Sequence, residues 1–286
     1  MFGRRSDGRR IKNIDPFQKI VPHIMSARHD SQNSFSYEAE CEALDVYIAE
    51  KREKEGVSYN YMHIVMAAMV RLLALRPQLN RFVMRGKIYK RDKIYMSMAV
   101  KKSLKDDSPG TTLKVEFDGT ESIAEVKQKA DDAIRANATP KAYNDTDKTA
   151  RKLTRVPNWL IRLGVGALKR LDRRGLLPKK IIAASPFHTS FFITNMKSIK
   201  SDYIFHHLYD FGTTGLFVAM GKETMRPVVM PDGSLGAGKR MGMGFVTDER
   251  FCDGFYYVTS FRLLKEMLLN PHILDQRLKA KTEDAD

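Results

Sequence analysis

The sequence predicts an α+β fold in which helices and strands do not alternate strictly. Residues 59–75 form an apolar segment with helical spacing that is apolar on most of its sides, so we expect a buried helix. Four segments after residue 189 have strand composition: 190–195, 215–221, 226–230 and 242–247. Helical segments precede and follow these strands, which indicates a layer of helices packed on a sheet.

Length and composition are those of a globular protein. The chain has 286 residues, of which 43% are hydrophobic and 29% charged. Its longest apolar runs, Ile64–Val70 and Leu72–Leu75, are much shorter than the roughly 20 residues that cross a bilayer. No apolar segment follows the basic N-terminus, so no signal peptide is expected. Only Cys41 and Cys252 are present, which excludes a disulfide scaffold and favours a cytoplasmic location.

The positive charge is concentrated in two segments. The formal net charge is +15, of which residues 1–12 contribute +4 and residues 151–180 contribute +9, leaving +2 for the rest. No zinc-finger spacing, helix-turn-helix or aromatic RNA-binding strand accompanies these segments. A nucleic-acid partner is therefore not expected.

The N-terminal half predicts alternating short elements. Residues 1–15 are expected to be a flexible basic arm, and Asp15 is expected to cap a helix from Pro16 to about residue 27. The elements expected next are a strand at 34–39, a helix at 42–55 ended by Gly56, the buried helix at 59–75 capped by Ser58, a hairpin of 81–84 and 88–90 around Gly86, strands at 93–100 and 111–117, and a helix at 123–137.

The C-terminal half contains the strands named above and two helical regions. Residues 138–150 are expected to be a loop, and 151–180 contain an amphipathic helix that starts at Asn158 and stops at Gly175. A last helix is expected at 255–269, followed by a charged tail at 273–286. The glycines between 233 and 244 lack the Lys-Ser/Thr of a phosphate loop, so they predict a turn between two strands.

One motif lies between the last strand and the last helix. Residues 248–255 read D-E-R-F-C-D-G-F. This segment resembles the D-H-R-x-x-D-G signature of the acyltransferase component of 2-oxoacid dehydrogenase complexes. Its C-D-G-F part is also similar to the H-x-x-x-D-G motif of chloramphenicol acetyltransferase.

Other segments resemble the same family in the same order. Residues 16–40 are similar to the family's opening helix and first strand, residues 57–79 to its long buried helix ending in P-x-L-N, and residues 80–100 to its hairpin. Residues 191–196 (F-F-I-T-N-M) are similar to its F-T-I-S-N-L strand, and residues 215–229 to a strand pair ending in R-P-V. The resemblance covers 16–137 and 186–272, about three quarters of the chain.

The resemblance implies a two-layer α/β sandwich of the chloramphenicol acetyltransferase type, with a mixed sheet and helices on one face. This single domain would span 16–272, with a basic helical insertion at about 140–183. The implied activity is CoA-dependent acyl transfer between CoA and a thiol, hydroxyl or amine acceptor. Family members form homotrimers, or larger cores, with the active site at the subunit interface. No lipoyl domain precedes residue 16, so a lipoylated acceptor is expected to come from another chain; no metal is expected.

The resemblance also assigns candidate site residues. Glu249 stands where the family has its catalytic histidine, the general base. Thr194 lies at the position of the hydroxyl that stabilises the oxyanion from a neighbouring subunit, with Asn195 beside it. Asp253 and Gly254 would hold the motif loop. Two further candidates are Lys19, as the ionic partner of Asp253, and Ser190, as an alternative to Thr194 if the strand register shifts.

The replacement of the histidine by Glu249 leaves two interpretations open. Glu249 acts as an unusual base, or the site is inactive and the chain is a trimeric scaffold or regulatory binding protein, a pseudoenzyme. A carboxylate matches neutral-pH base catalysis less well than imidazole unless burial raises its pKa, and a nearby Arg250 would keep it ionised. His188 is a substitute base to test, whereas Cys252 is expected to be a packed residue.

The basic helix within 151–180 also has several interpretations. Apolar residues follow a helical period and include Trp159, while basic residues occupy the remaining positions. The helix is expected to pack on its own domain with a solvated basic face. Alternatively, it binds an anionic membrane surface as a membrane-peripheral element, contacts an acidic partner or the phosphates of CoA, or covers part of the trimer.

Overall fold

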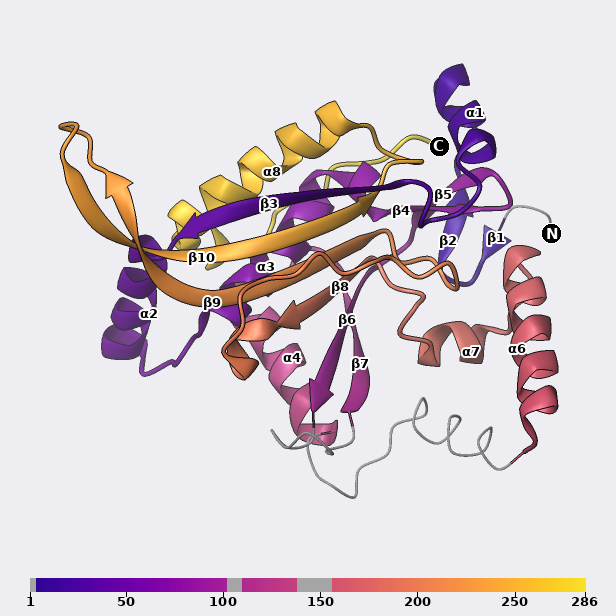
Figure 1. The fold of residues 1–286 in the computed structure, drawn as a ribbon, viewed down its shortest axis with the longest axis horizontal. Coiled ribbons are helices and arrows are strands. Elements are labelled where there is room, and N and C mark those ends of the chain that lie inside the picture. The colour runs from indigo at the N-terminus through magenta and orange to yellow at the C-terminus, as the bar shows by residue number, and fades with distance from the viewer. Residues whose placement is uncertain (1–3, 102–109, 138–155) are drawn as a thin grey trace.

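The computed structural model describes residues 4–101, 110–137 and 156–286 (Figure 1). Its main feature is a six-stranded mixed sheet in the order β3-β10-β9-β8-β6-β7. The strands are β3 (Gln32–Glu40), β6 (Ile94–Lys101), β7 (Gly110–Phe117), β8 (Phe191–Asn195), β9 (Leu216–Val229) and β10 (Leu235–Asp248). Strand β8 runs parallel to both of its neighbours, and the other pairs are antiparallel. The predicted mixed sheet is therefore confirmed.

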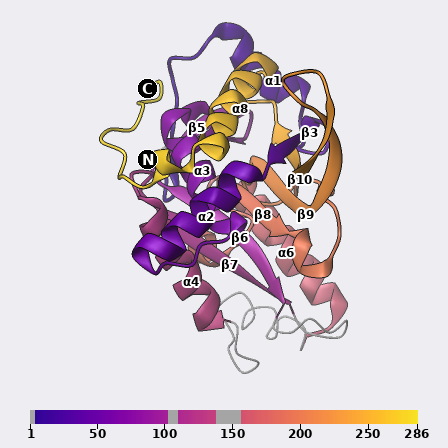
Figure 2. The same cartoon turned by 90° about the vertical axis from the view of Figure 1, so that its left-hand side faces the viewer.

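Helices cover one face of this sheet (Figures 1 and 2). They are α2 (Glu42–Glu55), α3 (Tyr61–Leu75), α4 (Ile123–Asn137) and α8 (Gly254–Leu269). Helix α3 lies at the centre and is buried along almost its whole length, because its sequence is apolar on nearly every side. Its cap is Asn60, whose side chain accepts from the His63 N–H at 3.0 Å; the expectation of Ser58 was wrong. The two-layer arrangement agrees with the prediction.

The remaining helices lie outside this layer. They are α1 (Pro16–Ile24), α6 (Asn158–Arg173), α7 (Lys179–Ala184) and three 3-10 turns at Pro77–Asn80, Met196–Ile199 and Pro271–Leu274. Asp15 caps α1 as expected, accepting from the Phe17 N–H at 2.8 Å. Helix α6 begins at Asn158, and Gly175 follows it with a φ of 68°, also as expected.

The predicted flexible arm is an ordered hairpin over its described part. Strands β1 (Arg4–Arg5) and β2 (Gly8–Arg10) join β5 (Lys87–Arg91) and β4 (Arg81–Met84) in a second sheet. Arg5 and Asp7 are buried, because they pair with each other and with groups of the main domain. The prediction from charge alone was wrong, since it could not show that these charges have buried partners.

The C-terminal segment is anchored along the domain. Arg71 donates to the Gln276 carbonyl at 2.6 Å, and the Thr282 N–H donates to the Ala74 carbonyl at 3.0 Å. Arg81 pairs with Asp284, and both side chains are buried. The charged tail of the sequence is thus part of the fold.

A coil crosses the face of the sheet opposite the helices. Residues 202–204 approach β9 and β10 so closely that a Cβ at Gly244 would lie 2.6 Å from the Ile204 carbonyl oxygen. Leu208 of the same coil packs on Phe192, Phe217 and Val246. Glycine inside β10 is therefore needed for packing, while the predicted turn between β9 and β10 is formed around Gly233, which has a φ of 83°. Within the described ranges, no helix is both long and apolar enough to span a bilayer.

Candidate functional site

The motif loop is organised by a buried ion pair between Asp248 and Arg250. The Arg250 Nε donates to Asp248 Oδ1 at 2.8 Å and its Nη2 to Asp248 Oδ2 at 2.7 Å. The Asp248 carboxylate also accepts from Ser31 Oγ at 3.1 Å, and Arg28 lies 3.8 Å away. Asp248, rather than Asp253, is the carboxylate whose ion pair holds this loop.

Glu249 lies just beyond the end of β10, at the edge of the sheet. Its backbone N–H donates to the Ser31 carbonyl at 3.0 Å, and its Oε2 accepts from the side-chain amide of Asn33 on β3. Arg250 is turned back toward Asp248 and pairs with it, so its positive charge does not lie against the Glu249 carboxylate as expected. Glu249 is half-buried and oriented by an amide donor. A carboxylate in this position can accept a proton from a group that reaches the sheet edge.

Asp253 caps helix α8 instead of pairing with Lys19. Its carboxylate accepts from the Tyr256 N–H at 2.8 Å, as expected for an aspartate at a helix N-terminus. Across the three described ranges, no ion pair of Asp253 is formed. Lys19 of α1 lines a separate small hollow beside His23 and Gly86. The expected Lys19–Asp253 pair is therefore wrong, and Gly254 is simply the first residue of α8.

Thr194 lies on β8 with its side chain on the face opposite the helices. Phe191 and Ile193 belong to the core beneath the helices, whereas Phe192 packs on the other face, and Thr194 shares that face by strand alternation. Thr194 is half-buried, and within the described parts of the chain its hydroxyl makes no hydrogen bond. It is therefore free to donate to a ligand.

The neighbours of Thr194 have structural contacts. Asn195 accepts from the Lys197 N–H at 3.1 Å and so starts the following 3-10 turn. Ser190 is buried, and its Oγ accepts from the Tyr95 N–H at 2.9 Å. Because Ser190 fixes β8 to β6 in this way, it does not replace Thr194, and that alternative was wrong.

Glu249 and Thr194 are far apart within one chain. Thr194 is in register with Ala219 of β9, which is in register with Gly244 of β10. Glu249 follows Gly244 by five residues, so the two candidates are separated by about 17 Å along the strands at roughly 3.3 Å per residue. A single chain therefore does not bring the two groups around one reacting atom.

His188 belongs to a buried network of charges rather than to the motif loop. Its Nε2 lies 3.1 Å from Asp172 Oδ1, and its Nδ1 lies 2.8 Å from Ser185 Oγ. Burial lowers the pKa of His188, although the contact with Asp172 opposes this effect. Both ring nitrogens are thus occupied by partners inside the domain, Nε2 by Asp172 and Nδ1 by Ser185. His188 is therefore not a substitute base for Glu249.

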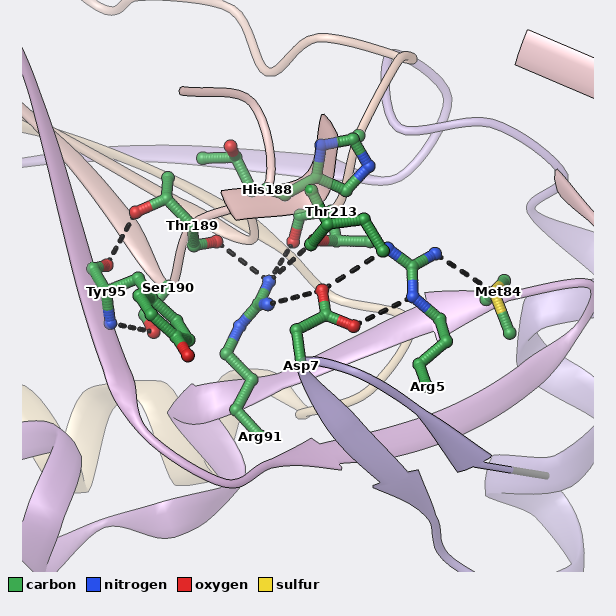
Figure 3. Close-up of polar contacts among 12 residues, drawn as sticks. Arg5, Asp7, Met84, Arg91, Tyr95, His188, Thr189, Ser190 and Thr213 are labelled. Atoms are coloured by element: carbon green, nitrogen blue, oxygen red, sulfur yellow. Dashed lines mark hydrogen bonds and ion pairs between the residues drawn. The ribbon is translucent and has the colours of Figure 1, made fainter. Parts of the chain in front are cut away.

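The same network connects the two sheets through Arg91 of β5, which bonds to Asp7 on one side and to the segments before β8 and β9 on the other (Figure 3). Arg5 donates to Asp7 with its Nε at 2.8 Å, and Arg91 Nη1 lies 3.6 Å from the same carboxylate. Arg91 also donates from Nη2 to the carbonyls of Thr189 at 2.8 Å and Thr213 at 2.6 Å. Burial lowers the pKa of Arg91 to about 10. Arg91 Nε and Nη1 make no hydrogen bond among the described residues, but the network is buried and joins separate segments of the fold, which makes its role structural.

The other predicted or possible site features are accounted for. Cys252 is buried, and burial raises its pKa well above its usual value, so it is a packed residue as predicted. The described residues contain no cluster of side chains able to hold a metal ion. A hollow of about 620 Å³ lies between β5, β6 and the C-terminal segment, and neither Glu249 nor Thr194 lines it.

The fold is that of the acyltransferases which the sequence resembles. A probable dihydrolipoamide acetyltransferase from Listeria monocytogenes 4b F2365 superposes with a TM-score of 0.56 at 15% identity, covering 95% of this chain and 97% of that one. The cubic core of the pyruvate dehydrogenase multienzyme complex gives a TM-score of 0.56 at 12% identity, covering 92% and 93% of the two chains.

Chloramphenicol acetyltransferase shares the fold to the same degree. Its TM-score is 0.56 at 13% identity, and the match covers 91% of this chain and 99% of that chain. No protein-family model and no curated protein sequence matches the chain. The likeness confirms the predicted fold over almost the whole length of both chains.

Sequence reasoning missed the groups that fix the motif loop and the inserted helix. Asp248 and Asp172 were visible as single acids, the first at a strand end and the second alone in a basic segment. Asp172 is the one acid on an otherwise basic helix, and this was the only sign in the sequence that it has a buried partner. That partner is Arg5, which long-range contacts bring to it.

Proposed function

We propose that the protein is a CoA-dependent acyltransferase that works as a homotrimer. The fold, shared with acyltransferase cores over more than nine tenths of this chain, is the observation that carries the proposal. The separation of Glu249 and Thr194 within one chain supports an active site built between two copies. Glu249 of one copy and Thr194 of its neighbour would then face the same acyl group.

In the proposed reaction Glu249 moves the proton and Thr194 stabilises the oxyanion. Glu249 removes the proton from a thiol, hydroxyl or amine acceptor, which attacks the thioester carbonyl of acyl-CoA. Thr194 donates a hydrogen bond to the oxyanion of the tetrahedral intermediate. The carbon–sulfur bond of the thioester then breaks. The CoA thiolate leaves and takes the proton that Glu249 removed from the acceptor. The Asn33 amide supports this role because it orients the Glu249 carboxylate.

Release of free CoA tests the proposal. Acetyl-CoA and succinyl-CoA would be offered with dihydrolipoamide and with small hydroxyl and amine acceptors. Glu249→Gln and Thr194→Val should each lower turnover by about 10²–10³-fold. Glu53→Gln, at an exposed position on α2, is the matched control and should have no effect. Absence of turnover with every pair, not restored by Glu249→His, would contradict catalysis.

A second candidate is a trimeric scaffold without catalysis, favoured by the carboxylate at the position of the family's histidine. Sedimentation equilibrium would give three times the chain mass under both proposals. Only the scaffold predicts that this trimer forms while Glu249→Gln leaves every measured property of the protein unchanged.

A further inference from the structure

Helix α6 contacts the rest of the domain through one narrow side. Ile161 and Leu168 are half-buried and share this side with Asp172, which is buried. Asp172 accepts from Arg5 Nη1 at 2.8 Å and lies 3.1 Å from His188 Nε2. Figure 1 shows α6 at the periphery of the molecule, away from the helix layer. The Asp172 contacts fix the rotation of the helix about its own axis.

This rotation turns an apolar stripe outward. Trp159 is 66% exposed and Leu163 65%, values typical of surface polar residues rather than of a packed helix. The α6 stripe is defined as the exposed apolar residues on this side of the helix together with Val156, which lies just before it: Val156, Trp159, Leu160, Leu163 and Leu171. The expectation that α6 packs its apolar face on its own domain was wrong. The described part of the chain leaves the stripe uncovered.

The charges around the α6 stripe are all positive. Asp172 is the only acid between residues 156 and 183, and it is turned inward. The exposed charged residues of this region are Arg162, Lys169, Arg170, Arg173, Arg174, Lys179 and Lys180. Within the described residues none of these seven forms an ion pair. Helical spacing places Arg162, Lys169 and Arg173 along one flank of the stripe.

These features select an occupant for the stripe. A second copy would bring the same basic helix against this one, and like charges in contact oppose that pairing. From Trp159 to Leu171 the stripe extends about 18 Å along the convex surface of the helix, at 1.5 Å per residue, and the hollows of about 620, 200 and 140 Å³ are not lined by α6. A bilayer surface accepts a convex apolar stripe along its full length, and anionic lipids complement the basic flank.

We propose that α6 is an interfacial helix that binds the protein to an anionic phospholipid membrane. The α6 stripe enters the boundary between headgroups and acyl chains, with Trp159 near one end. The arginines and lysines beside it contact lipid phosphates. The Asp172 contacts hold the helix in the orientation that this binding needs.

Trp159 provides a direct test because it is the only tryptophan of the chain. The full chain would be mixed with phosphatidylcholine vesicles, with and without phosphatidylglycerol. We expect a blue shift of the Trp159 emission and co-sedimentation with the anionic vesicles only. Brominated lipids should quench the emission, and raised salt should weaken binding. No shift with anionic vesicles, or equal binding to neutral ones, would overturn the proposal.

Two variants with matched controls separate the contribution of the apolar stripe from that of the basic residues beside it. Leu163→Glu should weaken vesicle binding more than tenfold, whereas Leu235→Glu, which changes an 81% exposed residue at the start of β10, should not. Arg162→Glu combined with Arg173→Glu should also weaken it more than tenfold, since each basic residue near an anionic surface contributes about fivefold. Lys265→Glu on α8 is the charge control. Equal effects of variants and controls would contradict a role for α6.

A change in Trp159 emission with protein concentration alone would assign the stripe to a second copy and reject the membrane proposal. Acyl transfer in solution is measured in parallel. We expect it to be unchanged in all these variants, so failure of vesicle binding is distinguishable from failure of the proposed activity.

Discussion

Arg5 and Asp172 form a buried ion pair, with Arg5 Nη1 and Asp172 Oδ1 2.8 Å apart, although 167 positions separate them in the chain. The pair joins the N-terminal hairpin to the end of α6. His188, from the segment before β8, completes it. Three segments that are distant in sequence are therefore held together by one carboxylate, which makes Asp172 the point at which the stability of this region is most directly tested.

Asp172→Asn should destabilise the protein by about 2–4 kcal/mol, because it removes one of the two carboxylates that neutralise the buried Arg5, leaving Asp7 as the other. Urea unfolding measures the change. Asp132→Asn is the control, since Asp132 and Arg135 form an exposed pair on α4, and it should cost no more than about 1 kcal/mol. If the single variant does not fold, Arg5→Met combined with Asp172→Leu should recover a folded chain. Equal, small losses for Asp172→Asn and its control would show that the buried pair contributes little.

The network should make stability fall in acid. Burial lowers the pKa of His188 below 6.5, so the folded state disfavours the charged ring and its contribution is present above pH 6.5 and lost as the pH falls. Burial alone would raise the pKa of Asp172, but His188 and Arg5 lower it to about 2, so its contribution is lost between about pH 4 and pH 2. The free energy of unfolding should therefore decrease in two stages.

Urea titrations at several pH values measure both stages. His188→Gln should reduce the loss of stability between pH 7 and pH 5. It should also reduce the loss below pH 4, because His188 is one of the groups that lower the pKa of Asp172. Part of the loss of stability between pH 7 and pH 5 should remain in this variant, because burial also lowers the pKa of His63. A pH profile unchanged by His188→Gln would contradict the buried, neutral state of this ring.

The coil that crosses the sheet should make Gly244 intolerant of a side chain. Gly244→Ala would place a methyl group 2.6 Å from the Ile204 carbonyl oxygen, so we expect a loss of about 1–3 kcal/mol. Gly166→Ala is the matched control within α6, where a new Cβ meets nothing within 4 Å, and it should stabilise the helix by up to about 1 kcal/mol. Thermal unfolding of the two variants should shift in opposite directions; shifts in the same direction would refute the close approach.

Lys114 on β7 should oppose folding at neutral pH. Its Nζ donates to the Ile182 carbonyl at 2.9 Å, beside a hollow of about 200 Å³, and burial lowers its pKa to about 7. The unfolded chain then binds more protons than the folded chain from pH 7 to about pH 10, so stability should rise over this range. Lys114→Met should be more stable at pH 7 and show a flatter profile. Lys265→Met, exposed on α8, should leave the profile unchanged.

Local patterns predicted most of the elements. The helices at 42–55 and 123–137 have the bounds that capping and periodicity indicate, and the strands around the Gly86 turn differ by one residue. These signals are local because helix ends and hairpin turns are set by the few residues that form them. The motif at 248–255, with its resemblance, predicted the fold that the structural comparison confirms.

The sequence by itself therefore determined most of the elements, the fold and the identities of Glu249 and Thr194 as candidates. Only the tertiary structure decided that residues 4–10 form strands, that Asp248 rather than Asp253 pairs in the motif loop, and that Lys19 lies elsewhere. It also decided that α6 turns its apolar stripe to the outside. The physical reason is that a charged or apolar side chain has many chemically equivalent partners in a sequence, and only the packing of distant segments selects one of them.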